Sequence, residues 1–231
     1  WLRNFGKITS YLSPLWDFSV EGTPPPDMAN RAYVVVSNHE SNVDPFLLSW
    51  LPWDMRWIAK EQLFKVPFFG LLLRFGGDIP LRRADKESVL EMLDVCRETL
   101  RGGLSIMMFP EGTRSRDGRL RPFKDGAFQL AIETSAPIMP VAIAGTRDCL
   151  PAGSITLGEA RAKARILEPI ETAGLGLEDV AALRERTRDR IALAAEQLRE
   201  ELGIVLPEAE SEQPKKKKKG LLSWGPLSGL V

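Results

Sequence analysis

Histidine and cysteine are nearly absent from this sequence, which contains one histidine, His39, and two cysteines, Cys96 and Cys149. A structural zinc site takes four cysteine or histidine ligands, and these three side chains cannot supply them. Two cysteines are also too few for the disulfide framework of a secreted domain, so the sequence favours a reducing compartment. We therefore expect a protein that binds no metal and is not held together by disulfides.

Long apolar runs and an excess of one charge are also missing. No stretch of eighteen consecutive apolar residues occurs, so no transmembrane helix is predicted, and the first residues form no secretory signal pattern. The chain starts at Trp1 rather than at a methionine, which leaves open an anchor that precedes it. Lysine plus arginine and aspartate plus glutamate number 31 each, so the average charge indicates no particular partner.

The composition that remains is that of a folded domain, with 231 residues, 44% of them hydrophobic and 27% charged. Apolar, β-branched segments alternate with amphipathic ones, which predicts an α/β layered domain. Asp85 is the predicted N-cap of the first long helix. The predicted strands cover residues 32–38, 55–60, 77–81, 104–109, 137–145 and 160–170, and the predicted helices cover 85–102, 126–135 and 178–202.

The two ends of the chain have their own patterns. Apolar residues recur at helical spacing from Trp1 to Leu15, which predicts a helix that packs on the domain or lies in a membrane interface. Near the other end, Lys215 to Lys219 precede an apolar tail with Trp224. This tail is predicted to be a secondary membrane anchor or a solvated, disordered segment. No aromatic residues alternate with the lysines, which argues against nucleic-acid binding.

The stretch "VVVSNHESNVDPFLL" places His39 after a predicted strand and Asp44 at a predicted helix start, with Asp44 as N-cap and Pro45 in the first turn. Loops at the carboxyl ends of strands are where α/β proteins build their sites. An imidazole can take a proton from a hydroxyl near neutral pH, and a carboxylate behind it fixes its tautomer. The alternative is a capping Asp44 beside a structural His39.

A second polar loop, "FPEGTRSRDGRLRPFKDG", also follows a predicted buried strand. Arginine offers a planar fork that matches phosphate oxygens, and Gly112 allows a ligand to approach the backbone. Residues 111–114 are nearest the strand and are the predicted site. Residues 116–124 are predicted to be a solvated basic loop.

Together these stretches resemble the motifs of the glycerolipid acyltransferase family. "NHESNVD" resembles its N-H-x-x-x-x-D motif, "FPEGTRS" its third motif, "GGDIPLRR" its second and "APIMPVAI" its fourth. "AKEQLFKVPFFG" is similar to a stretch between the first two motifs, and all five occur in the family's order. The branch they resemble most is the 1-acylglycerol-3-phosphate (lysophosphatidate) acyltransferases, to which the threonine after Glu-Gly points.

The resemblance implies a role for each matching residue. His39 would be the general base that deprotonates the acceptor hydroxyl, and Asp44 would orient it and stabilise its charge. The other implied residues bind substrate, and they are Glu111, Gly112, Thr113, Arg114, Arg83 and Lys60. Pro80 and Arg82 depart from the second motif, where an aromatic and an acidic residue are usual, which leaves the acceptor open.

The reaction implied by the resemblance is acyl transfer from an acyl-CoA or acyl carrier protein thioester to 1-acylglycerol 3-phosphate, giving phosphatidate without a cofactor. The partners would be a lysophospholipid, the thioester donor and a membrane surface, with the protein peripheral or monotopic on the cytoplasmic face. Residues 66–75 would face lipid, cover an acyl-chain tunnel or form a buried helix. The implied fold is a single α/β domain with a mixed, largely parallel central β-sheet flanked by helices. The implied organisation is an N-terminal helical or interfacial segment and linker over 1–30, an acyltransferase catalytic domain over 31–206 and a flexible polybasic and apolar tail over 207–231.

Three alternatives stay open at this point. The first keeps the chemistry with another acceptor, such as glycerol 3-phosphate, another lysophospholipid or a lyso-aminolipid. The second is a serine hydrolase that uses His39, although the G-x-S-x-G motif is missing. The third is a lipid-binding module without catalysis. The sequence does not decide the acceptor, the type of thioester, the chain length or the oligomeric state.

Overall fold

The computed structural model describes residues 2–82, 85–115, 117–150 and 156–207. Within these residues, seven strands form one sheet in the order β1-β7-β6-β2-β5-β3-β4. Strands β2 to β6 all run parallel, β7 is antiparallel to β6, and β1 is parallel to β7. This confirms the predicted mixed, largely parallel sheet. The strands are β1 Trp16–Glu21, β2 Val34–Ser37, β3 Met55–Lys60, β4 Ile79–Leu81, β5 Ser105–Met108, β6 Ile138–Ala144 and β7 Ala160–Ile166.

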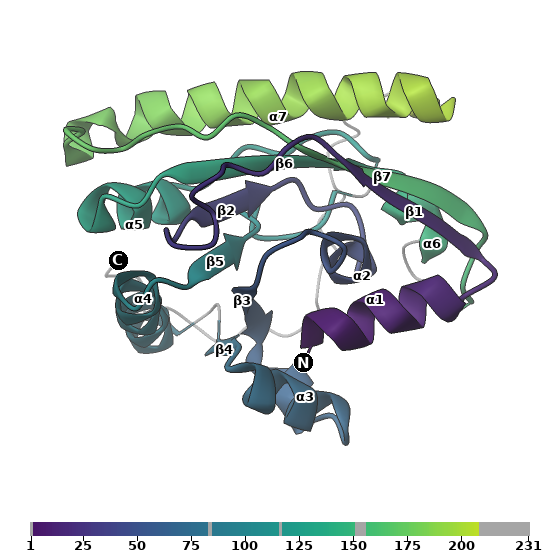
Figure 1. The fold of residues 1–231 in the computed structure, drawn as a ribbon, viewed down its shortest axis with the longest axis horizontal. Helices are drawn as coiled ribbons and strands as arrows, with labels where there is room; N and C mark the ends of the chain where they lie inside the picture. The colour runs from purple at the N-terminus through teal and green to yellow at the C-terminus, as the bar shows by residue number, and fades with distance from the viewer. Residues whose placement is uncertain (1, 83–84, 116, 151–155, 208–231) are drawn as a thin grey trace, which may run out of the picture.

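Helices cover both faces of the sheet, with α7 and α5 on one face and α1 and α2 on the other (Figure 1). The helix α4 packs against the same core as α5 and α7. The α-helices are α1 Leu2–Leu12, α2 Asp44–Leu48, α3 Phe69–Gly76, α4 Lys86–Arg101, α5 Gly126–Thr134, α6 Thr146–Cys149 and α7 Val180–Leu202, and two 3₁₀ turns span Glu61–Lys65 and Leu177–Asp179.

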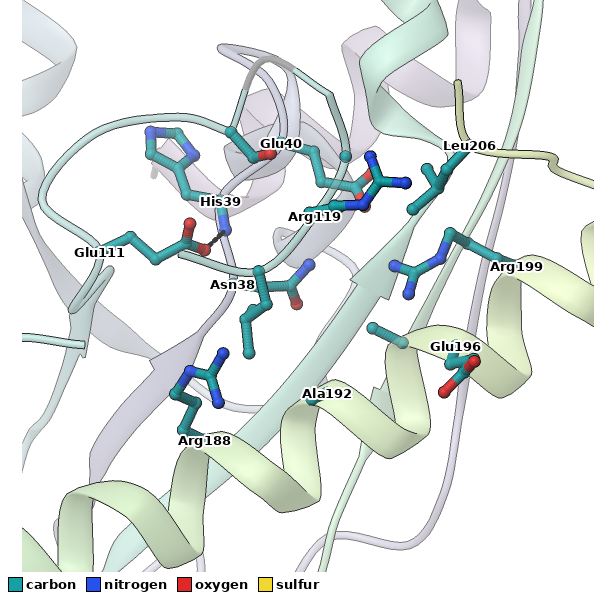
Figure 2. A pocket seen from close by; sticks show the side chains of 14 residues that line it. Asn38, His39, Glu40, Glu111, Arg119, Arg188, Ala192, Glu196, Arg199 and Leu206 are labelled. Atoms are coloured by element: carbon teal, nitrogen blue, oxygen red, sulfur yellow. Dashed lines mark hydrogen bonds between the residues drawn. The ribbon is translucent and has the colours of Figure 1, made fainter. Parts of the chain in front are cut away.

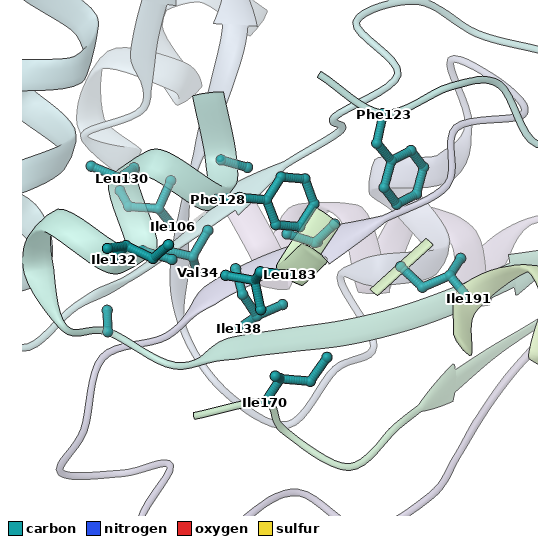
Figure 3. Packing of buried hydrophobic residues seen from close by; sticks show 14 of the residues in the cluster. Val34, Ile106, Phe123, Phe128, Leu130, Ile132, Ile138, Ile170, Leu183 and Ile191 are labelled. Carbon is teal, nitrogen blue, oxygen red and sulfur yellow. The ribbon is translucent and has the colours of Figure 1, made fainter. Parts of the chain in front are cut away.

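The central strands are apolar throughout because both of their faces are buried. Val34 and Val36 of β2 pack toward α5 and α7, while Val35 packs toward α2. Figure 3 shows the first of these cores, in which Phe128 of α5 and Leu183 of α7 lie close to the sheet. The two layers hold β2 and β5 rigidly, so the loops that follow these strands start from fixed points.

Two predicted helices have the structure that the sequence indicated. The Asp85 side chain caps α4 by accepting hydrogen bonds from the backbone N–H groups of Glu87 and Ser88. The helix α7 buries the apolar stripe predicted for residues 178–202 and begins at Val180, after a 3₁₀ turn. Lys215–Lys219 and Trp224 lie outside the described residues.

The strand β1 was missed by the sequence analysis, which assigned residues 1–30 to a helix and a linker. Trp16, Phe18 and Val20 alternate with polar residues, which is a strand pattern, and Phe18 is buried. The strand pairs with β7, with Phe18 opposite Ala162. The N-terminal segment therefore contributes to the central sheet as well as a helix.

The helix α1 packs through its small and polar side and exposes its apolar side. A Cβ added to Gly6 would lie 3.0 Å from the Ser49 side chain, so the helix approaches α2 closely there. The Ser10 hydroxyl accepts a 2.8 Å hydrogen bond from the Trp50 indole. The apolar side chains left exposed on this helix are Phe5, Ile8, Tyr11 and Leu12.

The helix α3 has a similar exposed side and packs beside α1 (Figure 1). Leu73 is buried, whereas Phe68, Leu71 and Phe75 are exposed. The segment 66–75 is therefore only partly a buried helix. Within the described part of the chain, no helix is both long enough and apolar enough to span a bilayer.

Candidate active site

The site lies at the edge of the sheet where the parallel strands end, as expected for an open α/β sheet. His39 follows β2, Glu111 follows β5 and Thr146 follows β6, so residues far apart in the sequence meet there. Lys60 is the last residue of β3 at the same edge. The sheet therefore gathers several predicted site residues by its topology alone.

The His39 imidazole and the Asp44 carboxylate are in direct contact, with Nδ1 and Oδ2 2.6 Å apart. Asp44 is fully buried. Its oxygens accept hydrogen bonds from the backbone N–H groups of Glu40 and Ser41 and from the Thr146 hydroxyl. A carboxylate surrounded by donors needs a donor from His39 as well, which assigns the proton to Nδ1 and leaves Nε2 as the basic nitrogen.

The predicted N-cap role of Asp44 is wrong. The helix α2 begins at Asp44 itself, Val43 stands at the cap position, and no side chain caps the helix. The Asp44 carboxylate turns back toward the preceding loop, because that loop presents two N–H groups and the imidazole to it. The Asp-Pro pair that indicated a cap therefore lies in the first turn of α2, and the Asp44 carboxylate pairs with His39 instead.

The Phe109 ring stacks on the His39 imidazole, with centroids 4.1 Å apart and planes 15° from parallel. Phe109 follows directly after β5. An aromatic face on one side and a carboxylate at Nδ1 leave the imidazole little rotational freedom. The sequence analysis quoted this phenylalanine within a motif but gave it no role.

Glu111 ties the second polar loop to the first. Its carboxylate accepts a 2.8 Å hydrogen bond from the backbone N–H of His39 and a 3.1 Å hydrogen bond from the backbone N–H of Arg121. The Ser115 N–H donates to the His39 carbonyl at 2.8 Å. His39 and Glu111 lie 72 positions apart in the sequence, so this hydrogen bond joins the loops that follow β2 and β5. Glu111 thus holds the backbone of His39 in place.

The loop that carries His39 is also bonded to β6. The Asn38 amide exchanges two 2.9 Å hydrogen bonds with the backbone of Ile143, in the manner of a strand neighbour. Glu40 accepts a 3.1 Å bond from the Gly145 N–H. These side chains extend the pairing of β2 and β6 beyond the last strand residue. The sequence offered no local signal for them, because their partners lie 105 positions away.

Burial changes the acidity of two carboxyl groups in the site. It raises the pKa of Glu40 to about 8, and the negative charge of Asp44 acts in the same direction. Burial likewise raises the pKa of Glu111 to about 7, against the opposing effect of its two backbone hydrogen bonds. Both groups therefore hold a proton more firmly in the folded protein than in the unfolded chain, where the pKa is near 4.5.

The free energy of unfolding should consequently fall as the pH rises from about 5 to 8. In that window the folded state binds more protons than the unfolded state, and each such carboxyl group contributes up to about 1.4 kcal/mol per pH unit. Urea unfolding across the range would measure the slope. Glu40→Gln should flatten it, and the exposed control Glu196→Gln should not. An unchanged slope in Glu40→Gln would contradict the assignment to Glu40.

The predicted substrate-binding residues lie at the same edge but are not all in contact. Gly112 has a φ of +70°, which favours glycine, and it approaches the Lys124 side chain. Thr113 and Lys60 are exposed and Arg114 is half-buried. Arg83 lies outside the described residues. Within the ranges that the structure describes, no group of three histidine, cysteine or acidic residues is arranged to hold a metal ion.

The fold and the His39–Asp44 pair define a protein of the α/β class with a site suited to taking a proton from a bound hydroxyl. The family model described as Acyltransferase matches residues 19–144, more than half of the chain. The chain belongs to the acyltransferase family.

Proteins similar to this chain carry closely related names. The chloroplastic 1-acyl-sn-glycerol-3-phosphate acyltransferase BAT2 of Brassica napus is 38% identical over 141 residues, which are 61% of this chain and 41% of that protein. The 1-acyl-sn-glycerol-3-phosphate acyltransferase alpha of Homo sapiens is 35% identical over 163 residues, which are 69% of this chain and 57% of that protein. This chain thus spans about two-fifths to three-fifths of these relatives.

The fold is also similar to a solved structure. The crystal structure of the 1-acyl-sn-glycerophosphate (LPA) acyltransferase PlsC from Thermotoga maritima aligns with a TM-score of 0.73 and 31% identity. The alignment covers 86% of this chain and 78% of that one.

Proposed function

We propose that this protein transfers a fatty acyl group from a thioester to the free hydroxyl of 1-acylglycerol 3-phosphate and so makes phosphatidate. The observation that supports it best is the pairing of His39 with a fully buried Asp44, which directs the basic Nε2 away from the carboxylate. The names of the similar proteins support the choice of acceptor.

In the proposed mechanism, Nε2 of His39 takes the proton of the acceptor hydroxyl as its oxygen attacks the thioester carbonyl. The imidazolium that forms is stabilised by Asp44 across the 2.6 Å contact. The C–S bond then breaks, and the proton on Nε2 passes to the departing thiolate. A thioester is an activated donor, so the reaction needs no acyl-enzyme and no further cofactor. The donor would be acyl-CoA or acyl carrier protein.

The acceptor phosphate would be bound by basic residues at the same sheet edge. These residues are Arg114, which lies three positions after Glu111, and Lys60, the last residue of β3. Arg83 is proposed as a third phosphate ligand because of its position in the sequence motif. Glu111, Gly112 and Thr113 would line the glycerol part of the acceptor. Arginine and lysine recognise phosphate by charge, and arginine adds two parallel hydrogen bonds.

The test is acyl transfer by the purified protein in detergent micelles, with palmitoyl-CoA and palmitoyl carrier protein offered separately. Turnover with 1-acylglycerol 3-phosphate well above that with glycerol 3-phosphate or other lysophospholipids is expected. A preference for one of those would correct the acceptor. Release of free fatty acid without an acceptor would indicate a hydrolase. Lipid binding without any turnover would favour a binding module.

We also propose that the protein docks on the cytoplasmic face of a membrane through α1 and α3, as a peripheral or monotopic enzyme. Both helices expose apolar side chains and lie beside each other, which would let both of them contact one membrane surface. Phe68 has a φ of +60°, rare for a bulky residue, and is 81% exposed. Such a surface gains free energy by entering the interfacial region of a bilayer.

Replacing Leu71 and Phe75 by serine should weaken binding to vesicles by at least tenfold, because inserting each apolar side chain is worth up to roughly 1.5–3 kcal/mol. Sedimentation with vesicles containing anionic lipid would measure it. The matched control replaces Leu90 and Leu193 by serine, since these leucines are similarly exposed on α4 and α7. Equal losses in both variants would contradict the α1–α3 surface.

A further inference from the structure

A cavity of about 470 Å³ lies between the loop that carries His39 and the helix α7. Its walls come from the loop at residues 38–40, the second polar loop, α7 and Leu206 beyond it. Figure 2 shows the His39 imidazole pointing away from α7, so the cavity adjoins the catalytic loop on the side opposite the ring. Neither Lys60 nor Arg114, the proposed acceptor ligands, lines it.

The α7 side of the cavity follows from the sequence of that helix. Arg188, Ala192, Ala195 and Arg199 are spaced by four, three and four residues, so they share one face. The alanines leave open space, and the arginines flank it about three turns apart. Figure 2 shows Arg188 and Arg199 on either side of Ala192, with Arg119 across from Arg199.

The three arginines have unused hydrogen-bond donors. The Nη1 atom of Arg119 is buried without a hydrogen-bond partner, although the Asp117 carboxylate lies 3.5 Å away. The Arg199 guanidinium forms no hydrogen bond or ion pair with any residue that the structure describes. Among the residues that the structure describes, the Arg188 guanidinium is paired only with its neighbour Asp189, at 3.6 Å. Arg119 was predicted to be solvated, and its side chain is 42% exposed apart from this buried atom.

Two other arginines of α7 have partners in the fold, and a third, Arg186, is exposed. Arg184 pairs with Asp125 and Glu185, and Arg190 donates to the Glu168 carbonyl. The contrast separates arginines that stabilise the fold from Arg188 and Arg199, whose donors face the cavity. Spare guanidinium donors around one space are suited to an anion with several oxygens.

Three glutamates also line the cavity, and the positive charge of Arg199 acts on one of them, Glu40, by lowering its pKa against the effect of burial. Glu111 accepts hydrogen bonds from two backbone N–H groups and Glu40 accepts one from a third, so these carboxyl groups already have partners. Burial also favours their neutral forms. Glu196 is exposed on α7 and is free to turn to solvent.

We propose that this cavity binds a phosphate ester carried by one of the two substrates, through Arg119, Arg188 and Arg199. The ester belongs either to the thioester donor or to the lysophospholipid headgroup. The identity of these two ligands rests on the proposed function. The preference for a phosphate group rests on the cavity alone.

Calorimetric titration of the full chain tests it with two pairs of probes that differ by their phosphate groups. The pairs are CoA with pantetheine, and micellar lysophosphatidate with monoacylglycerol. Wild type should bind the phosphate-bearing member of at least one pair more tightly. Arg188→Met with Arg199→Met should raise that Kd tenfold or more, because each lost charged contact is worth about a factor of ten.

The matched control replaces Arg101 and Arg186 by methionine, which removes the same charge from exposed helix positions. It should bind like wild type. A second variant, Ala192→Leu, fills the cavity without changing charge and should also weaken binding. Loss of CoA binding alone assigns the ester to the donor, and loss of lysophosphatidate binding alone assigns it to the acceptor.

Equal Kd values in wild type and both cavity variants would overturn the proposal, as would wild-type binding that ignores the phosphate groups. Because the readout is binding, its failure is separate from failure of the proposed function. Arginine-dependent binding without acyl transfer would refute the activity and keep the site. Acyl transfer together with binding that does not depend on these arginines would support the activity and refute the site.

Discussion

Replacing His39 by alanine should lower the turnover number for acyl transfer at least a hundredfold. General-base catalysis contributes roughly 10²–10⁴ in rate, and His39 is the only histidine in the chain, so no other imidazole can replace it. The KM values should change little, because the acceptor and donor contacts proposed here lie on other residues. Initial rates in detergent micelles, with wild type and variant side by side, would measure the effect.

The control for this variant is its stability, because the imidazole also stacks on Phe109. Urea unfolding should show that the variant is folded under the assay conditions. The loss of turnover then cannot come from unfolded protein. A variant with wild-type turnover would refute His39 as the base while leaving the membership in the acyltransferase family intact. A loss of turnover that tracks a loss of folded protein would assign His39 a structural role.

The parts of the fold that could be predicted are those whose signal is local. The buried stripe of α7 repeats every three or four residues, and the valines of β2 form an unbroken run because both faces of that strand are covered. The Asp85 cap was visible for the same reason, since a capping side chain bonds to N–H groups two and three residues ahead.

The strand β1 and the orientation of α1 depended on partners elsewhere in the chain. The alternation in Trp16–Glu21 became a strand because β7, some 140 residues later, offers a free edge. The periodicity of α1 located an apolar face correctly, but only the contacts of Gly6 and Ser10 with α2 show that this face is the exposed one. Amphipathicity alone does not tell which side of a helix is buried.

The candidate site divides in the same way. His39 and Asp44 are five residues apart, so a single turn of chain could be predicted to join them. Glu111 follows β5 and His39 follows β2, and these two strands are parallel neighbours, so both residues lie at the same edge of the sheet. Thr146 follows β6 at the same edge, but it lies outside the resembled motifs, so nothing in the sequence marked its hydroxyl as a partner of Asp44, 102 positions away.

Replacing Asp44 by asparagine should reduce turnover by about 10³–10⁴-fold, as expected when an imidazole is held in the wrong tautomer. Every group around the carboxylate is a donor: the N–H groups of Glu40 and Ser41, the Thr146 hydroxyl and Nδ1 of His39. An asparagine amide brings an NH₂ group among them. The simplest relief is for Nδ1 to accept from that NH₂ group, which moves the imidazole proton to Nε2 and removes the base.

The same substitution should also lower the free energy of unfolding by about 1–3 kcal/mol, because a fully buried position would hold mismatched donors. Asp54→Asn is the matched control, since this aspartate is 74% exposed, and it should change neither quantity. Turnover and urea unfolding measured on both variants separate two roles of Asp44. A variant that loses stability but keeps wild-type turnover per folded molecule would make Asp44 only a support for the loop, and it would contradict the mechanism. Loss of both, with the activity loss far exceeding the unfolded fraction, is the result that a carboxylate bonded to both the loop and the imidazole predicts.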